Sequence, residues 1–299
     1  MLEDVYDALW AGMDIPEKLI NTLHLHQEYH LKSTISRITS QWALLGPFDS
    51  GTNLFETMVR MNFGMNFGMN FLWKHTTLGA SAIIEAMAKI VQAAGEQLSD
   101  VVLVLMVRSP ISQIVSWKKA SYNLKDCLNR AFADMGHPCT AVTNCCDTHE
   151  GADTCSSQTF LSTMDAYNTY LQQFQELRQA GAFKDVLLIT YEDLVLNPAK
   201  VMRAFGHACE ANIPSEIKLL EAPAKNHGDA VGREAALAKL ATRSWMNNFK
   251  FDAAGLEVLC KGLDRSLIRD IVEGTDLDAG EQVPYSHDCG ALAMLGEQA

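Results

Sequence analysis

The sequence feature that most constrains the fold lies at residues 42–55. A short apolar run ends at Gly46-Pro47, a small polar loop containing Gly51 follows, and helix-forming residues begin at Asn53. A strand, a glycine-bearing loop and a helix N-terminus together bind anions, because backbone N–H groups converge there and the helix dipole favours negative charge. The stretch therefore predicts a phosphate-binding loop after the first strand of an α/β domain.

This loop departs from the phosphate loop of nucleotide hydrolases, G-x-x-x-x-G-K-[ST]. Counted from Gly46, Thr52 stands at the lysine position and Asn53 stands at the serine or threonine position. The lysine that reaches the outer phosphates and the hydroxyl that holds magnesium are both missing. The loop is therefore predicted to bind phosphate without supporting metal-assisted cleavage of a nucleoside triphosphate.

Charge and hydropathy restrict the class of partner. The net charge of −12 argues against general nucleic-acid binding and is compatible with a neutral or cationic small substrate. Residues 1–7 are acidic where a secretory signal would be basic, and the longest strongly apolar run, residues 101–107, is too short to cross a bilayer. We expect a soluble cytoplasmic protein with a small-molecule partner and no nucleic-acid or membrane partner. The sequence leaves the oligomeric state open, a homodimer included.

Strand and helix patterns alternate along the 299 residues. The continuous β-branched and apolar run at residues 101–107 predicts a central parallel strand that is covered on both faces. Further strands are expected near residues 41–46 and 186–190. Helices are expected over residues 1–36, 53–60, 81–97, 111–122, 160–180, 198–211 and 253–263. The alternation predicts a three-layer α/β fold, with a central parallel sheet flanked by helices in a single domain of residues 1–275 and a polar C-terminal tail at 276–299.

Two stretches fit this pattern less simply. Residues 61–71 repeat the unit Met-Asn-Phe-Gly almost three times, with the two-residue period of a half-buried strand. We interpret the repeat as a tandem duplication that lengthens a connection, with a substrate wall as the alternative. Residues 124–157 lose periodicity, and a stretch of this length is predicted to be a Cys-rich insert or lid. Unpaired thiols and a local disulfide both remain open for its cysteines, whereas the absence of a C-x-x-C pair disfavours zinc.

Two further strand ends carry polar residues. Arg108 follows the run at 101–107, and Ser116 lies eight residues on, about two turns into the next helix. Arginine offers a rigid fork to phosphate oxygens and serine adds a donor, although an arginine at a strand end is also a common structural ion-pair partner. The segment Tyr191-Glu-Asp-Leu-Val-Leu-Asn-Pro198 follows the strand expected at 186–190.

Over roughly residues 40–250, these segments resemble the sulfotransferases that use 3′-phosphoadenosine 5′-phosphosulfate (PAPS). In that family a P-x-S-G-T loop cradles the 5′-phosphosulfate, a strand-end Arg with a Ser eight residues later binds the 3′-phosphate, and the tyrosine of a Y-E-D-L-x-x-N-P segment lies near the adenine. The cofactor contacts that the resemblance implies are Ser50, Gly51, Thr52, Asn53, Arg108, Ser116 and Tyr191.

The sequence departs from the family at two places near the reacting atoms. Asp49 stands where the family has a lysine, and an anion there is unfavourable unless it faces the acceptor, to orient a cationic substrate or help remove its proton. The family's K-T-H segment, which carries a catalytic histidine, is approximated by Lys74-His75 without the middle residue. The resemblance implies Lys74 as the cation at the leaving phosphate and His75 as the general base, with the two roles exchangeable.

A late segment of the family, R-K-G before G-D-W-K-N, closes over the 3′-phosphate. Residues 242–249 resemble its second part. Lys239 fits the first part in register, and Arg233 and Arg243 compete for the same phosphate contact.

The implied reaction transfers a sulfuryl group from PAPS to a hydroxyl or amine and requires no metal. The acidic chain and Asp49 favour a small polar acceptor, with an amine or a guanidinium alkaloid as candidates, and the loop also resembles small sulfotransferases of microbial toxin pathways. Two other functions remain open. A nucleotide or small-molecule kinase is disfavoured by the missing lysine and Ser/Thr of the loop, and a catalytically altered sulfotransferase-like binding protein is suggested by Asp49.

Overall fold

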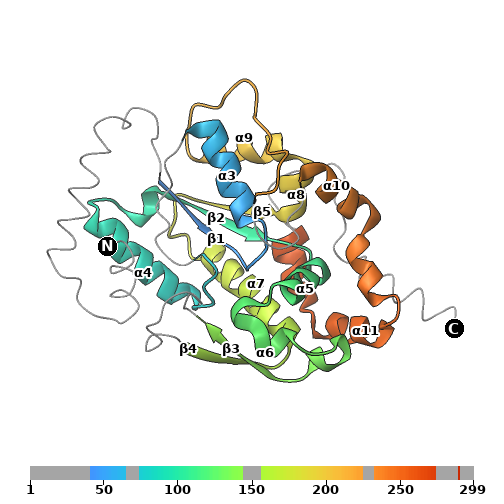
Figure 1. Ribbon diagram of the computed structural model, residues 1–299. Helices are drawn as coiled ribbons and strands as arrows, with labels where there is room; N and C mark the ends of the chain where they lie inside the picture. The colour runs from blue at the N-terminus through green and yellow to red at the C-terminus, as the bar shows by residue number, and fades with distance from the viewer. Residues whose placement is uncertain (1–40, 65–73, 144–155, 225–231, 274–288, 290–299) are drawn as a thin grey trace.

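The computed structural model describes residues 41–64, 74–143, 156–224, 232–273 and 289 (Figure 1). The helix expected over residues 1–36, most of the Met-Asn-Phe-Gly repeat, three cysteines of the Cys-rich stretch and the tail apart from Cys289 lie outside the described residues.

The described core is a three-stranded parallel sheet. Strand β2 (Val101–Val107) lies between β1 (Gln41–Leu45) and β5 (Asp185–Thr190), with Gln41 opposite Val101 and Val102 opposite Asp185. Every residue of β2 is buried, because both edges of the strand are paired and both faces are covered. The prediction of a central parallel strand at residues 101–107 is therefore confirmed.

Helices cover both faces of the sheet (Figure 1). Alternate residues of β2 point to opposite faces: Val101, Leu103 and Leu105 pack with α4 (Ala80–Ala93) and α7 (Thr163–Gln179). Val102, Val104 and Met106 pack on the other face with α3 (Thr52–Phe63) and α9 (Pro198–Ala208). The chain thus has the three-layer α/β fold that the alternation predicts, with helices on both sides of a parallel sheet.

The other helices follow the strand ends. They are α5 (Pro110–Lys119), α6 (Lys125–Leu128), α8 (Tyr191–Leu196), α10 (Arg233–Thr242), α11 (Ala253–Gly262) and α12 (Arg265–Leu267). None of the helices in the described ranges is both long and apolar enough to cross a membrane.

Several expected helix boundaries were wrong, and one helix was missed. The helices expected to reach residues 97 and 122 end at Ala93 and Lys119. The helix expected from residue 160 begins at Thr163, because the Ser162 side chain accepts a hydrogen bond from the Asp165 N–H and so forms the N-cap. Residues 191–196, expected only as a motif, form α8, which the Thr190 side chain caps in the same way. The helix expected to continue to 211 ends at Ala208.

The beginning of the repeat is helical, not strand-like as its period predicts. Helix α3 continues to Phe63 and ends at Gly64, which has the left-handed conformation that favours glycine (φ 62°). Tertiary contacts hold this last turn, since Asn62 exchanges hydrogen bonds with the backbone of Lys218 and the Phe63 ring packs edge-on against Phe205. Packing on α9 therefore overrides the two-residue pattern of the sequence.

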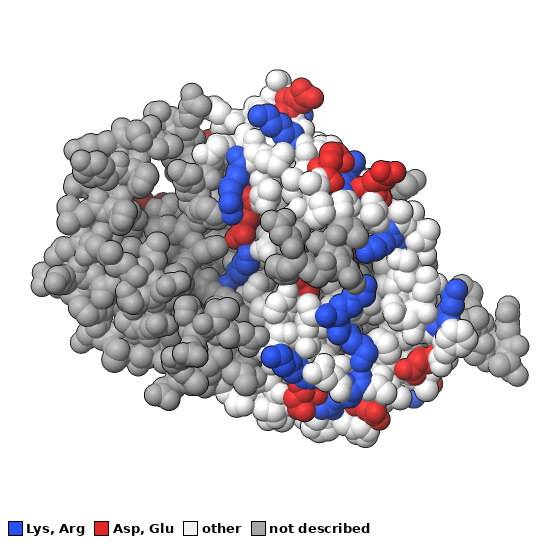
Figure 2. Space-filling model, viewed as in Figure 1, with Lys and Arg blue, Asp and Glu red and all other residues white. Residues whose placement is uncertain are grey.

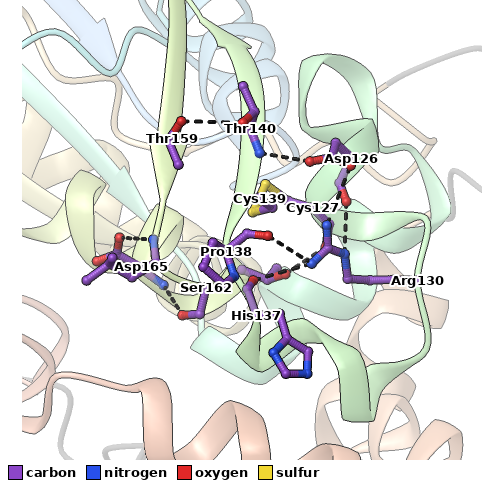
Figure 3. Close-up of a disulfide and its surroundings, with 12 residues drawn as sticks. Asp126, Cys127, Arg130, His137, Pro138, Cys139, Thr140, Thr159, Ser162 and Asp165 are labelled. Atoms are coloured by element: carbon purple, nitrogen blue, oxygen red, sulfur yellow. Dashed lines mark hydrogen bonds and ion pairs between the residues drawn. A yellow bond between two sulfur atoms is a disulfide. The ribbon is translucent and has the colours of Figure 1, made fainter.

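The described part of the Cys-rich stretch has regular structure, so the expected loss of structure is wrong for residues 124–143. Strand β3 (Cys139–Thr143) pairs antiparallel with β4 (Ser156–Phe160), and a buried disulfide joins Cys127 to Cys139. Figure 3 shows the Arg130 guanidinium bonded to the carbonyls of His137 and Pro138, which closes the same loop a second time. A lid role for residues 124–157 stays a prediction.

A second disulfide joins Cys260 of α11 to Cys289. Disulfides persist in oxidising environments and are rare in cytosolic proteins. The two disulfides therefore weigh against the cytoplasmic location expected from the sequence, which stays a prediction.

Candidate functional site

The loop of residues 46–51 turns sharply between β1 and α3. Asp49 (φ 59°) and Gly51 (φ 96°) both have positive φ angles, and Ser50 is fully buried with its N–H and hydroxyl both bonded to the Pro47 carbonyl. A Cβ at Gly51 would lie 2.9 Å from Cδ2 of Tyr191, so only glycine fits between the loop and that ring. The hydroxyl of Ser50, an implied cofactor contact, is thus turned into the loop.

Helix α5 fixes the loop from the side. The Phe48 carbonyl accepts hydrogen bonds from Gln113 Nε2 (2.6 Å) and Trp117 Nε1 (2.7 Å). Arg108, at the end of β2, donates from Nη1 to the Asp49 carbonyl (3.0 Å). The loop conformation is therefore held by side chains of the neighbouring strand end and helix.

Arg108 lies at the centre of a hydrogen-bonded group. Its Nη1 donates to Ser116 Oγ (3.1 Å), its Nε donates to Ser112 Oγ (2.9 Å), and its guanidinium lies 4.4 Å from the ring centre of Tyr191. Burial raises the pKa of the Tyr191 phenol, with the nearby Arg108 charge acting in the opposite direction. Nη2 of Arg108 has no hydrogen-bond partner among the described residues. The structure thus joins Arg108 to Ser116, the pair that the resemblance implies, and leaves donor capacity on the guanidinium.

A cavity of about 390 Å³ opens beside this group. Among the described residues, its charged lining side chains are four cations and one anion, in a chain whose net charge is −12. Figure 2 shows Lys and Arg side chains running down the face of the molecule beside the place where Figure 1 draws α5, with Asp and Glu side chains above and below them. The lining also includes apolar side chains, among them Leu54, Met58, Leu219 and Leu220. The implied cofactor residues that line the cavity are Gly51, Thr52, Asn53, Arg108, Ser116, Tyr191, Arg233 and Lys239, together with Asp49.

The structure separates the three competing basic residues of the late segment. Arg233 and Lys239, both on α10, line the cavity, whereas Arg243 caps the end of that helix and is not part of the lining. Nε of Arg233 is buried without a hydrogen-bond partner among the described residues, and its Nη1 lies 3.9 Å from Glu221 Oε1. A buried donor of this kind at a cavity wall is costly unless a ligand or water accepts from it.

Lys74 and His75 lie behind the loop and are not part of the cavity lining. The Gly46 N–H donates to the Lys74 carbonyl (2.8 Å), so this segment runs beside the start of the loop. Lys74 Nζ donates to Asn53 Oδ1 (2.6 Å) and forms an ion pair with Glu56 Oε2 (2.9 Å). The structure therefore brings Lys74 to the first turn of α3, paired with a buried carboxylate.

The imidazole of His75 has a defined tautomer. Its Nδ1 lies 2.6 Å from the Gly46 carbonyl oxygen, which can only accept, so Nδ1 carries the proton and Nε2 is the basic nitrogen of the neutral ring. The Phe48 ring stacks on this imidazole on one face and on Tyr122 on the other. This arrangement orients a general base, although no contact with the cavity follows from it.

Sequence reasoning missed Ser112, Lys119 and Tyr122, which also line the cavity. Ser112, Ser116 and Lys119 follow one another at intervals of four and three residues, which places them on one face of α5. That spacing was visible in the sequence. The Tyr122 contact was not, because it depends on the turn after α5.

Comparisons with models of protein families, with curated proteins and with solved structures found no match for the chain. No group of three or more His, Cys, Asp or Glu side chains that could hold a metal ion occurs in the part of the chain that the structure describes. The expected independence from metal stays a prediction.

Proposed function

We propose that the protein is a PAPS-dependent sulfotransferase that acts on a small polar acceptor. The observation that carries the proposal is the cavity, in which the residues of the loop and the Arg108–Ser116 pair meet two basic residues of α10. A surplus of cations in one cavity of an acidic chain favours an anionic ligand. Its volume of about 390 Å³ lies within the range of small-molecule sites.

The lining suits a nucleotide with phosphates at two positions. Thr52 and Asn53 open α3, whose first-turn N–H groups favour one phosphate. Arg108 with Ser116, and Arg233 with its unpartnered Nε, are suited to a second phosphate. Leu54, Met58 and the neighbouring apolar side chains provide a surface for the base. A P-loop-like anion site at residues 46–53 is thus part of the proposal.

PAPS supplies an activated sulfuryl group. In the proposed reaction the acceptor oxygen or nitrogen bonds to sulfur, the bond from sulfur to the bridging oxygen of the 5′-phosphate breaks, and 3′-phosphoadenosine 5′-phosphate (PAP) leaves. The acceptor proton passes to Nε2 of His75, which the Gly46 carbonyl holds as the basic nitrogen. Backbone N–H groups of the loop stabilise the charge that grows on the bridging oxygen.

Asp49 lines the cavity beside the loop and carries the one carboxylate that the described residues contribute to the lining. An acceptor with an amine or guanidinium group would complement that charge, so cationic acceptors are the first to test. The same residue, together with the pairing of Lys74 to Glu56, supports a second candidate: a sulfotransferase-like protein that binds PAP or PAPS without turnover.

Thermal unfolding with ligands tests the proposal against a kinase. A ligand present at about 100 times its Kd is expected to raise Tm by about 5 °C. PAP without magnesium should give such a shift, and ATP with magnesium should not. A larger shift with ATP and magnesium would show that the sulfotransferase proposal is wrong.

Turnover separates the enzyme from the binding protein. Labelled PAPS, offered with a panel of amines, guanidines and alcohols, should yield a sulfated product whose formation is lost in His75→Ala. PAP binding without any sulfated product, and without slow hydrolysis of PAPS, would favour the binding protein.

A further inference from the structure

Three side chains behind the loop are joined by a hydrogen bond and an ion pair. Lys74 Nζ lies 2.6 Å from Asn53 Oδ1 and 2.9 Å from Glu56 Oε2. Only 17% of the Lys74 side chain and 8% of the Glu56 side chain are exposed. The positive charge of Lys74 is therefore balanced at short range, in surroundings that hold little water.

This contact fixes the orientation of the Asn53 amide. A lysine ammonium only donates hydrogen bonds, so the amide atom that faces Nζ is Oδ1 and the Nδ2 group faces the opposite way. Asn53 is the second residue of α3 and lines the cavity. The amide thus presents donors on the side away from Lys74.

We propose that Lys74 is a positioning residue, which holds Asn53 so that Nδ2 donates to the phosphoryl oxygens at the loop end of the cavity. The proposal rests on the proposed function, because it takes the 5′-phosphate of PAPS or PAP as the anion at that end. Asn53 then binds the ligand, and Lys74 acts through Asn53. Glu56 anchors Lys74 to the same helix, three residues after Asn53.

This role differs from that of a cation in direct contact with the leaving phosphate. A direct contact would depend on the Lys74 charge whether or not Asn53 is present. A positioning role disappears once the Asn53 amide is removed, and any donor-only side chain at position 74 can fill it. The two roles therefore predict different couplings between the two residues.

The experiment measures the Kd of PAP and of adenosine 3′-phosphate, which lacks the 5′-phosphate, by calorimetry. The variants are Asn53→Ala, Glu56→Gln, Lys74→Met/Glu56→Gln and the triple combination, with Lys74→Arg as the conservative variant. Glu56→Gln accompanies Lys74→Met so that no buried carboxylate is left unpaired. Lys184→Met, which removes the lysine of the Lys184–Glu210 ion pair outside the site, is the matched control.

Asn53→Ala should weaken PAP binding roughly 10- to 100-fold, as expected for the loss of a hydrogen bond to a charged group. Lys74→Met/Glu56→Gln should bind PAP about tenfold more weakly than Glu56→Gln alone. In the Asn53→Ala background, the same two substitutions should lower PAP affinity by less than about a further twofold. Lys74→Arg should stay near wild type, and adenosine 3′-phosphate binding should change little in any variant.

Independent effects of the Lys74 and Asn53 substitutions on PAP binding, or equal losses for both ligands, would overturn the positioning role. An unchanged Kd for PAP with a lowered kcat in Lys74→Met/Glu56→Gln would assign Lys74 to direct catalysis. Wild-type protein that binds neither ligand would overturn the proposed function itself, and this proposal with it.

Discussion

The cationic side chains on the two sides of the loop at residues 46–51 differ in their hydrogen-bond and ion-pair partners. On the cavity side, Arg108 retains an unbonded Nη2 and Arg233 retains a buried, unbonded Nε within the described part of the chain. Behind the loop, Lys74 is paired with Glu56 and bonded to Asn53, and the His75 Nδ1 is bonded to Gly46. Both sides carry the residue types that bind anions, but the cation behind the loop is already paired with a nearly buried carboxylate.

This difference predicts which substitutions lower ligand affinity and which lower the stability of the fold. A cation with spare donors gains hydrogen bonds when an anion enters, so its removal should affect ligand affinity more than folding. A cation that is paired in a nearly buried position offsets the desolvation cost of its carboxylate partner. Its removal should therefore lower the free energy of unfolding more than it lowers ligand affinity. Substitutions on the two sides of the loop test this division directly.

The largest effect is expected for Arg108→Met. This change removes the guanidinium that bonds Ser112, Ser116 and the Asp49 carbonyl and that faces the cavity. Two charge-assisted hydrogen bonds to a phosphate are worth about 3–4 kcal/mol, so PAP affinity should fall roughly 100- to 1000-fold. Calorimetric titration with PAP measures the loss.

Arg203→Met is the matched control for this prediction, because Arg203 on α9 lies outside the cavity lining and donates to the Ser215 carbonyl. PAP affinity should remain at the wild-type value in that variant. If Arg108→Met binds PAP as tightly as Arg203→Met does, the cavity side of the loop is not the phosphate site.

The next largest effect is expected for Glu56→Ala, behind the loop, and it is a loss of folding stability. Glu56→Ala leaves the Lys74 ammonium without its partner, in a position where 17% of the side chain is exposed. We expect the free energy of unfolding to fall by about 2–3 kcal/mol, less than for a fully buried pair because Lys74 retains some solvent contact. Denaturant unfolding measures the change.

The surface ion pair Lys184–Glu210 gives the comparison, since 61% of the Glu210 side chain is exposed. Glu210→Ala should cost less than about 1 kcal/mol. Equal losses in Glu56→Ala and Glu210→Ala would show that the pair behind the loop does not support the fold.

An intermediate effect is expected for Gly51→Ala, which should change both the stability of the fold and the affinity for PAP. The φ of 96° strains an alanine, and its Cβ would lie 2.9 Å from the Tyr191 ring. We expect a loss of about 1–2 kcal/mol in unfolding free energy, and weaker PAP binding because Tyr191 would move against Arg108. Gly95→Ala is a useful control: Gly95 also has a positive φ, of 77°, but a Cβ there meets nothing within 4 Å. Weaker PAP binding should occur only in Gly51→Ala.

The parts of the molecule that the sequence predicted are those governed by local pattern. The run at residues 101–107 predicted a central strand, because seven consecutive apolar residues fit a strand only where both faces of the sheet are covered. The Arg108–Ser116 contact was predictable because a strand end and the second turn of the following helix lie close together.

The parts that the sequence did not predict depend on partners far away in the chain. The ion pair of Lys74 with Glu56 joins residues that are 18 positions apart, and no local sequence pattern predicts this contact. The disulfide between Cys127 and Cys139 similarly requires the turn that brings α6 beside β3, so the sequence left a local disulfide and unpaired thiols both open. Loop and helix contacts of this kind also decided that Arg233, and not Arg243, lines the cavity.

The smallest predicted effect distinguishes two roles for Tyr191. The resemblance to sulfotransferases places this ring near the adenine, whereas the structure places it 4.4 Å from the Arg108 guanidinium and against Gly51. A ring that supports Arg108 needs its aromatic face and not its hydroxyl. Tyr191→Phe should therefore change PAP affinity less than about threefold, whereas Tyr191→Leu should lower it about tenfold by removing the cation–π contact.

The pH dependence sharpens the same test. Burial raises the pKa of the Tyr191 phenol above its ordinary value of 10.0, so the folded protein favours the neutral ring. The stability contributed by this shift is fully present below the ordinary pKa of tyrosine and is lost as pH rises through the raised pKa. PAP affinity measured from pH 7 to 9 should therefore follow the same course in wild type and Tyr191→Phe. A divergence between the two curves in that interval would show that the hydroxyl, and not the ring face, acts at the site.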